Sequence, residues 1–185
     1  MKIMLRGRKV IGGLAEGEAV VTKEPVSFLG GVNPDKGVVV ERGHELEGQS
    51  ITGKIFVFPH GKGSTAGPYI IYAMAKRKTA PVAMINVEAE PIIAVGAAMG
   101  NIPLVDRLDK NPLEVIATGD HVRIDGDQGK TQAQEQAGGQ GATSRTGPRE
   151  DAVPASTLGP GHRGVPRGTV RDDPVRVGDE RSAPE

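Results

Sequence analysis

The chain has 185 residues, 37% of them hydrophobic, and a net charge of zero from 23 Lys and Arg against 23 Asp and Glu. This length suits one domain with an appendage, and the charge balance argues against nucleic-acid binding. With no cysteine, no long apolar run and no recognisable signal peptide, we expect a soluble cytoplasmic protein without disulfides, thiolate-held metals or a membrane span.

The first part of the chain predicts short strands joined by glycine-rich turns. Apolar residues over 2–11, interrupted by Gly7, indicate one strand or a bent pair of strands. The β-branched runs 19–22 and 38–40 indicate further strands, and turn residues fill 29–37 between them.

The predicted fold is built around residues 55–78. The apolar run 55–58 ends in Pro59, a glycine-spaced loop follows, and a second apolar run closes on Lys76 and its basic neighbours. This pattern is typical of a strand, a tight loop and a helix whose cationic end suits its dipole. Ser64 would then lie where free backbone N–H groups favour an anion. The simpler alternative is that Ser64 only caps the helix.

The segment 81–124 predicts alternating strands and helices. Its first apolar run, 81–87, is typical of a strand buried on both faces. Pro91 starts a small-residue helix that Gly100 stops, and a short strand follows over 102–105. We predict two further strands over 113–117 and 121–124. The whole order favours an α/β fold, a layered β/β/α domain.

Composition changes at about residue 126. Every Phe, Tyr, Ile and Met lies before this point, whereas Gly, Pro, Gln, Arg and Asp dominate after it. A segment of that kind cannot bury enough apolar surface to offset the entropy lost on ordering. We therefore predict one domain over residues 1–126 and a disordered tail over residues 127–185.

Few polar side chains lie in or near the glycine-rich segments, where chemistry is expected. They are Arg8, Asn33, His44, His60, Lys62, Ser64, Thr65 and Glu88. None of the usual metal-ligand spacings occurs, so we expect no metal site in this chain. The glycines around Lys62 do not have the spacing of a phosphate loop, which argues against nucleotide hydrolysis.

Short motifs spread along the chain resemble the small subunit of the aconitase X family. In order, they are Gly7-Arg8, Gly13 with Ala15, Gly17 and Ala19, residues 28–32, Phe58-Pro59, Gly63-Ser64, Gly96-Ala97 and Ile102-Pro103. The resemblance runs from about residue 5 to residue 126, so it covers the predicted domain and not the tail.

The resemblance implies a swivelling β/β/α domain, like the mobile last domain of aconitase. It implies a hydro-lyase that is active only as a heterodimer with a large catalytic subunit, whose cysteines carry a [4Fe-4S] cluster; no cofactor is expected on this chain. The implied reaction dehydrates (R)-5-phosphomevalonate to trans-anhydromevalonate 5-phosphate, in the archaeal mevalonate pathway of isoprenoid biosynthesis.

The resemblance also implies roles for single residues. The serine of the family's Gly-Ser motif falls on Ser64 and is the expected proton acceptor. We expect Arg8, Lys62, Gly63 and Thr65 to bind the substrate, a phosphorylated hydroxy acid. A helix N-terminus and a nearby cation, Lys62 or Arg8, would favour the serine alkoxide.

Two alternatives stay open. A sister enzyme of the family, cis-3-hydroxy-L-proline dehydratase, would have the same architecture and a different substrate. A non-catalytic binding module would keep the fold without a large partner. The genes found beside this one would separate the two dehydratases.

Overall fold

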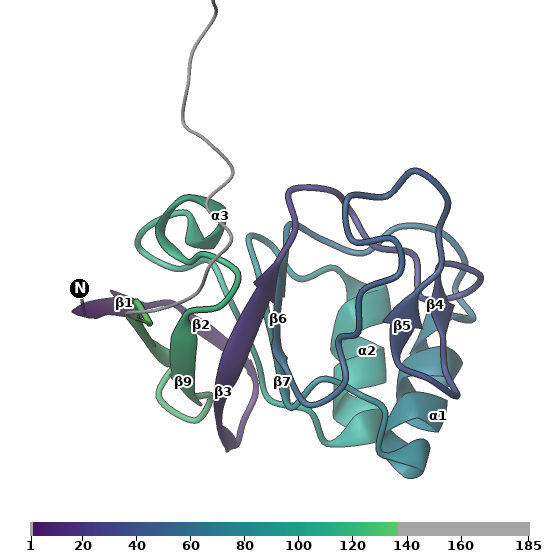
Figure 1. The fold of residues 1–185 in the computed structure, drawn as a ribbon. Coiled ribbons are helices and arrows are strands. Elements are labelled where there is room, and N and C mark those ends of the chain that lie inside the picture. The colour runs from purple at the N-terminus through teal and green to yellow at the C-terminus, as the bar shows by residue number, and fades with distance from the viewer. Residues whose placement is uncertain (1, 137–185) are drawn as a thin grey trace, which may run out of the picture. The chain divides into compact units, whose positions relative to one another are not determined.

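The structure is a computed structural model that describes residues 2–136. Most of the predicted tail, residues 137–185, lies outside the described residues. Within them the chain forms the strands and helices drawn in Figure 1. In chain order these are β1 Lys2–Arg6, β2 Arg8–Ile11, β3 Leu14–Val21, β4 Val32–Asn33, β5 Val38–Val39, β6 Ile55–Phe58, α1 Gly67–Arg77, β7 Ala83–Asn86, α2 Pro91–Gly100, β8 Leu104–Asp106, α3 Pro112–Val115, β9 His121–Asp125 and β10 Lys130–Gln134.

Eight of these strands form one sheet in the order β1-β10-β9-β3-β6-β7-β8-β2. Strand β3 joins its two parts: residues 14–18 pair antiparallel with β9, and residues 19–21 pair parallel with β6. On one side of β3 the neighbours are antiparallel. On the other side β6, β7 and β8 run parallel, and β2 closes the edge antiparallel to β8.

The parallel strands are buried on both faces, and each face packs into a different core. In β6, Ile55 and Val57 pack with the antiparallel strands, whereas Phe56 and Phe58 pack with the helices. This split follows from the period of two along a strand. Figure 1 shows α1 and α2 on one side of β6 and β7, with β3 and β9 on the other. These layers confirm the predicted β/β/α fold.

The two helices pack closely because a glycine lies between them. A Cβ atom added to Gly96 of α2 would come within 2.4 Å of the Ile71 side chain and 3.1 Å of the Pro68 backbone, both in α1. Pro68 is tolerated in the first turn of α1, where its missing N–H leaves no bond unmade. The helix ends at Arg77 with Lys76 and Arg77 in its last turn, as the sequence predicts, and Lys78 is its C-cap.

The predicted strand over 113–117 is wrong. Residues 112–115 form the short helix α3 instead, because Asn111 caps it: its Oδ1 accepts the backbone N–H of Leu113 at 3.1 Å. Pro112 then occupies the first turn of the helix. This capping chemistry outweighs the β preference of Val115 and Ile116.

The predicted domain boundary at residue 126 lies too early. Strand β10 follows it and is hydrogen-bonded on both sides, to β1 and to β9. Thr131 and Ala133 of this strand are buried and pair in register with Leu5 and Ile3 of β1. The first residues of the predicted disordered tail therefore belong to the domain.

Candidate active site

The parallel strands β3, β6, β7 and β8 end at the same edge of the sheet, where open α/β sheets place their ligands. We call the segments that leave them, residues 22–28, 59–66, 87–90 and 107–109, the C-terminal edge. Backbone bonds join these segments: Lys62 N–H donates to the Val26 carbonyl at 2.9 Å, and Val87 N–H donates to the Pro59 carbonyl at 3.1 Å. The edge is thus one connected surface that carries several of the expected site residues.

Ser64 lies in a turn ahead of α1 and is exposed. Its Oγ accepts the backbone N–H of Ala66 at 3.1 Å, and its carbonyl accepts the N–H of Gly67 at 3.0 Å. The cap position of α1 is Ala66, which has no capping side chain. Ser64 is therefore not the helix cap. Its hydroxyl sits in a local serine turn that orients Oγ and leaves the O–H proton free to donate elsewhere.

The loop that carries Ser64 needs glycine beside it. Gly63 has φ +94°, and a Cβ atom there would lie 2.7 Å from the Oγ of Ser27. A Cβ atom on Gly61 would lie 2.5 Å from Oε1 of Glu90. Since Glu90 caps α2 by accepting the N–H groups of Ile92 and Ile93, the loop packs directly on the start of that helix.

The two expected cations have carboxylate partners of their own. Lys62 Nζ lies 2.5 Å from Glu41 Oε1. Arg8 binds Asp106 and lies on β2, three positions from β6 in the sheet order, which is about 14 Å at the usual strand spacing. The structure thus brings Lys62, Gly63, Ser64 and Thr65 together in one loop and places Arg8 at the far end of the same edge.

Arg8 and Asp106 form a two-point ion pair. Arg8 Nε donates to Oδ1 at 2.9 Å and Nη2 donates to Oδ2 at 2.7 Å. The same Oδ2 accepts the N–H of Ala89 at 2.7 Å. The Asp106 side chain is 0% exposed, whereas that of Arg8 is 47% exposed. The hydrogen bond to Asp106 and its negative charge raise the pKa of Arg8, so the guanidinium keeps its charge.

Sequence reasoning did not single out Asp106. Its available signal was its place at the end of a short buried strand, directly at the edge where parallel strands present polar residues. The partner, Arg8, lies 98 residues away in the chain, so only the pairing of β2 with β8 brings the two together.

Further polar contacts join the segments near β3. Burial raises the pKa of Glu45, but hydrogen bonds from the Thr22 side chain and the Lys23 and Glu24 backbone outweigh it, so the net shift is downward. His44 is buried, and its Nδ1 accepts the backbone N–H of Leu46 at 3.1 Å. His44 thus serves the fold of its loop and does not face solvent.

No described residue set fits a metal or cluster. Within residues 2–136, no group of three or more His, Cys, Asp or Glu side chains could hold a metal ion. Cluster ligation needs thiolates, and the sequence contains no cysteine. An iron–sulfur cluster would therefore take its ligands from another chain.

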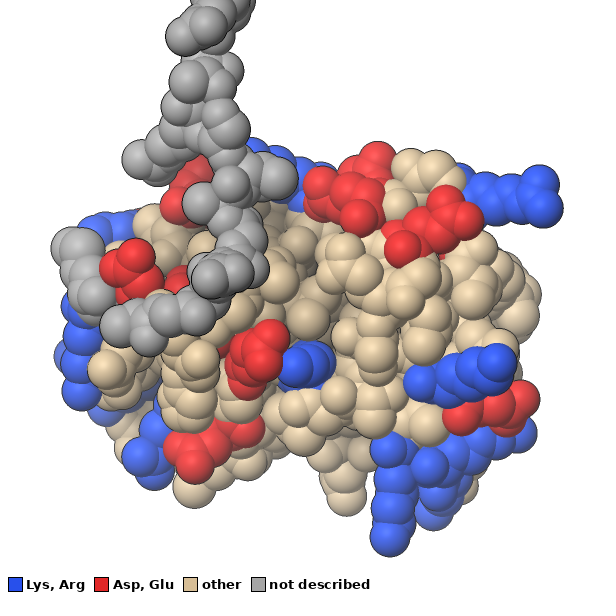
Figure 2. Space-filling view, viewed as in Figure 1, with Lys and Arg blue, Asp and Glu red and all other residues tan. Residues whose placement is uncertain are grey.

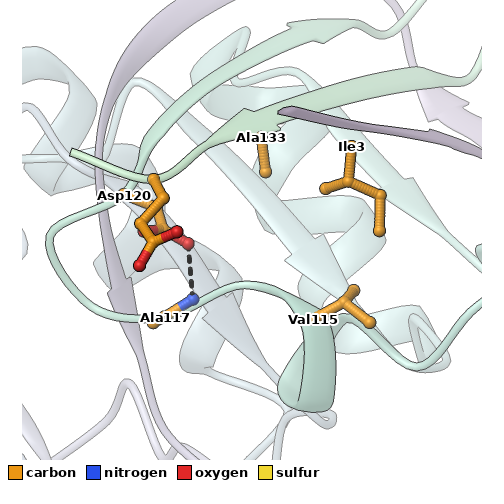
Figure 3. A pocket seen from close by; sticks show the side chains of 6 residues that line it. Ile3, Val115, Ala117, Asp120 and Ala133 are labelled. Atoms are coloured by element: carbon orange, nitrogen blue, oxygen red, sulfur yellow. Dashed lines mark hydrogen bonds between the residues drawn. The ribbon is translucent and has the colours of Figure 1, made fainter. Parts of the chain in front are cut away.

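A pocket of about 330 Å³ is lined by no residue of the segments that make up the C-terminal edge (Figure 3). Its lining comes from β1, β10 and the segment around α3: Ile3, Val115, Ala117, Asp120, Ala133 and Glu135. The Asp120 carboxylate already accepts the backbone N–H of Ala117 at 2.9 Å. The expected site residues do not line this mainly apolar pocket.

Charges of both signs are spread over the face shown in Figure 2. Neither sign forms one continuous patch there, which agrees with the even charge count of the sequence. A helix long and apolar enough to cross a membrane does not occur in the described part of the chain.

Comparison with known proteins by family model and by sequence identifies the same family. The model of the aconitase X swivel domain matches residues 4–133. The phosphomevalonate dehydratase small subunit of Methanosarcina acetivorans is 54% identical over 127 residues, which cover 69% of this chain and 88% of that protein. The one from Thermococcus kodakarensis is 51% identical over 131 residues, which cover 71% of this chain and 96% of that protein.

A solved structure agrees with the sequence match. The crystal structure of Thermococcus kodakaraensis aconitase X in its holo form has a TM-score of 0.69 and 50% identity, over 72% of this chain and 99% of that chain. Together with the layered fold, these matches confirm the resemblance seen in the sequence. The chain belongs to the aconitase X swivel domain family.

Proposed function

We propose that this chain is the small subunit of a phosphomevalonate dehydratase, a hydro-lyase that acts together with a large subunit. The observation that carries the proposal is the match to relatives of that name, 54% identical over 88% of one and 51% over 96% of another. The reaction removes a proton from the carbon beside the carboxylate of (R)-5-phosphomevalonate and the hydroxyl from the next carbon. A double bond and one water result.

Ser64 is the proton acceptor in this proposal. A serine hydroxyl is a weak base in water, so it needs a fixed position and a group that favours its deprotonated form. The N–H of Ala66, 3.1 Å from Oγ, supplies both, because a hydrogen bond donated to an oxygen stabilises its negative charge. Ser64 is exposed in the chain alone, so the large subunit must exclude water from it.

The substrate has an anionic group at each end, and the C-terminal edge offers donors at two places. Lys62, Gly63 and Thr65 lie in the loop of Ser64, whereas Arg8 lies across the sheet. We propose that one anionic end meets this loop and the other meets the Arg8 guanidinium, which binds carboxylate or phosphate oxygens in pairs.

The fold family implies a [4Fe-4S] cluster, which would assist departure of the hydroxyl as a Lewis acid. We assign that cluster to cysteines of the large subunit, since this chain has none. We further propose that the heterodimer works in the cytoplasm, in the archaeal mevalonate pathway to isoprenoids.

The proposed role of Ser64 is tested with Ser64→Ala in the pair of chains purified together without oxygen. Loss of a positioned base should lower kcat by about 10²- to 10⁴-fold, with the pair still assembled. Ser50→Ala is the matched control, because Ser50 Oγ accepts the N–H of Thr52 in the same kind of turn, but before β6 instead of after it. Equal activity of the Ser64→Ala and Ser50→Ala heterodimers would contradict the role of Ser64 as proton acceptor.

A further inference from the structure

We propose that Asp106 is a positioning residue that holds the Arg8 guanidinium in the orientation that binds one anionic end of the substrate. This inference rests on the proposed function, because it assigns Arg8 to the substrate of that reaction. It goes further by naming a buried residue that acts on the substrate only through Arg8.

The geometry of the pair leaves the binding side of Arg8 open. Asp106 takes the Nε–H and one Nη2–H of the guanidinium, at 2.9 and 2.7 Å. A guanidinium has five N–H donors in one plane, so the Nη1 group and the second Nη2–H point away from Asp106. These donors form the end of the fork that matches two oxygens of a carboxylate or phosphate.

Asp106 is itself held in place by the fold. It ends β8 opposite Arg8, and its Oδ2 also accepts the N–H of Ala89 just before α2. Ala89 precedes Glu90, against which Gly61 of the Ser64 loop packs. The carboxylate therefore fixes Arg8 relative to the same segments that carry the proposed proton acceptor.

Burial distinguishes this pair from the other ion pairs that Lys and Arg make in the described residues. Asp106 is 0% exposed, whereas the carboxylates of those other pairs are 28% to 72% exposed. Burying a carboxylate carries a desolvation cost that an ion pair often fails to recover, so net stability is a weak reason for this arrangement. Holding a half-exposed guanidinium in one orientation is the better explanation.

The charges around Arg8 favour recognition of an anion through direct hydrogen bonds. The other pair at this end of the edge, Arg107 with Glu88, is neutral as a unit and exposed on both sides, and the negative charge of Glu88 also acts on Arg8, whose pKa it helps to raise. With Arg8 and Asp106 also neutral as a unit, the edge attracts an anion through directed N–H donors more than through excess charge. Orientation of Arg8 therefore matters more here than its charge alone.

The test measures KM and kcat for 5-phosphomevalonate with the co-purified pair of chains. Asp106→Asn should raise KM by about 10- to 100-fold and change kcat little, because Arg8 would hold substrate and transition state alike. Arg8→Lys should raise KM similarly, since an ammonium keeps the charge and loses the fork. Asp127→Asn is the matched control: it removes the carboxylate of the neighbouring exposed pair with Lys9.

The decisive comparison uses the double variant Arg8→Lys with Asp106→Asn. If Asp106 acts through Arg8, the double variant has the KM of Arg8→Lys alone. Additive losses, or an unchanged KM in Asp106→Asn, would overturn the inference. Should Asp106→Asn fail to fold, Asp106→Glu keeps the charge and displaces the guanidinium, so the same rise in KM is expected. An unchanged KM in that variant would overturn the inference equally.

Two further experiments show whether Arg8 meets the phosphate or the carboxylate, and distinguish failure of the inference from failure of the proposed function. Unphosphorylated mevalonate is tested as an inhibitor of the heterodimer. It should bind the Arg8→Lys variant with the wild-type affinity if Arg8 meets the phosphate, and more weakly than the wild type if Arg8 meets the carboxylate.

A wild-type heterodimer that leaves 5-phosphomevalonate unchanged contradicts the proposed function. The same KM comparison is then made with cis-3-hydroxy-L-proline, whose carboxylate would meet the same guanidinium, and unchanged values there would overturn the inference too.

Discussion

The loop after β6 depends on the backbone freedom of Gly63, since its φ of +94° is a conformation that L side chains rarely adopt. Its neighbour Ser64 is oriented by a single local hydrogen bond, so any shift of Gly63 moves the proposed proton acceptor directly. Sequence reasoning identified this glycine and serine through their spacing. It did not predict the contact with Ser27, because that contact depends on the pairing of two loops.

Gly63→Ala should therefore lower the free energy of unfolding by about 1–3 kcal/mol, through backbone strain and the clash with Ser27 Oγ. Gly53→Ala is the control, because Gly53 also has a positive φ, +68°, but open space around its Cβ position. It should cost about 1 kcal/mol. Urea unfolding of each variant gives the comparison. Equal losses would show that the Ser27 contact carries no cost.

At the scale of elements, β10 completes the antiparallel layer. It lies between β1 and β9. Its inward residue Thr131 pairs with Leu5 and Ile124, and Ala133 pairs with Ile3 and Val122. These inward residues are small or polar, so the strand has almost no hydrophobic signal in the sequence. The parallel strands could be predicted because apolar residues fill them on both faces.

A chain ending at Gly126 should consequently be less stable than a chain ending at Gln136. Without β10, strand β1 loses its partner and Leu5, which is 0% exposed, meets water, at a cost of about 1.5–3 kcal/mol for that side chain alone. We expect a melting temperature lower by at least about 5 °C. Calorimetry of the two chains checks this. Equal melting temperatures would mean that β10 contributes nothing to the fold.

At the scale of the whole molecule, the proposed site is incomplete in this chain alone. Ser64 is exposed, Arg8 is half exposed, and the sequence has no thiolate for a cluster. The fold and the position of Ser64 in its loop were predictable from local patterns and the family resemblance. The Arg8–Asp106 pair was not, because it joins residues 98 positions apart through the edge strand of the sheet.

Turnover of 5-phosphomevalonate by the two chains, separately and together, tests the claim that the dehydratase needs this chain. The large subunit is purified without oxygen, this chain is added in increasing amounts, and formation of trans-anhydromevalonate 5-phosphate is followed. We expect no product from either chain alone and a rate that rises to a plateau at one small subunit per large subunit. Equal turnover by the large subunit with and without this chain would contradict the claim.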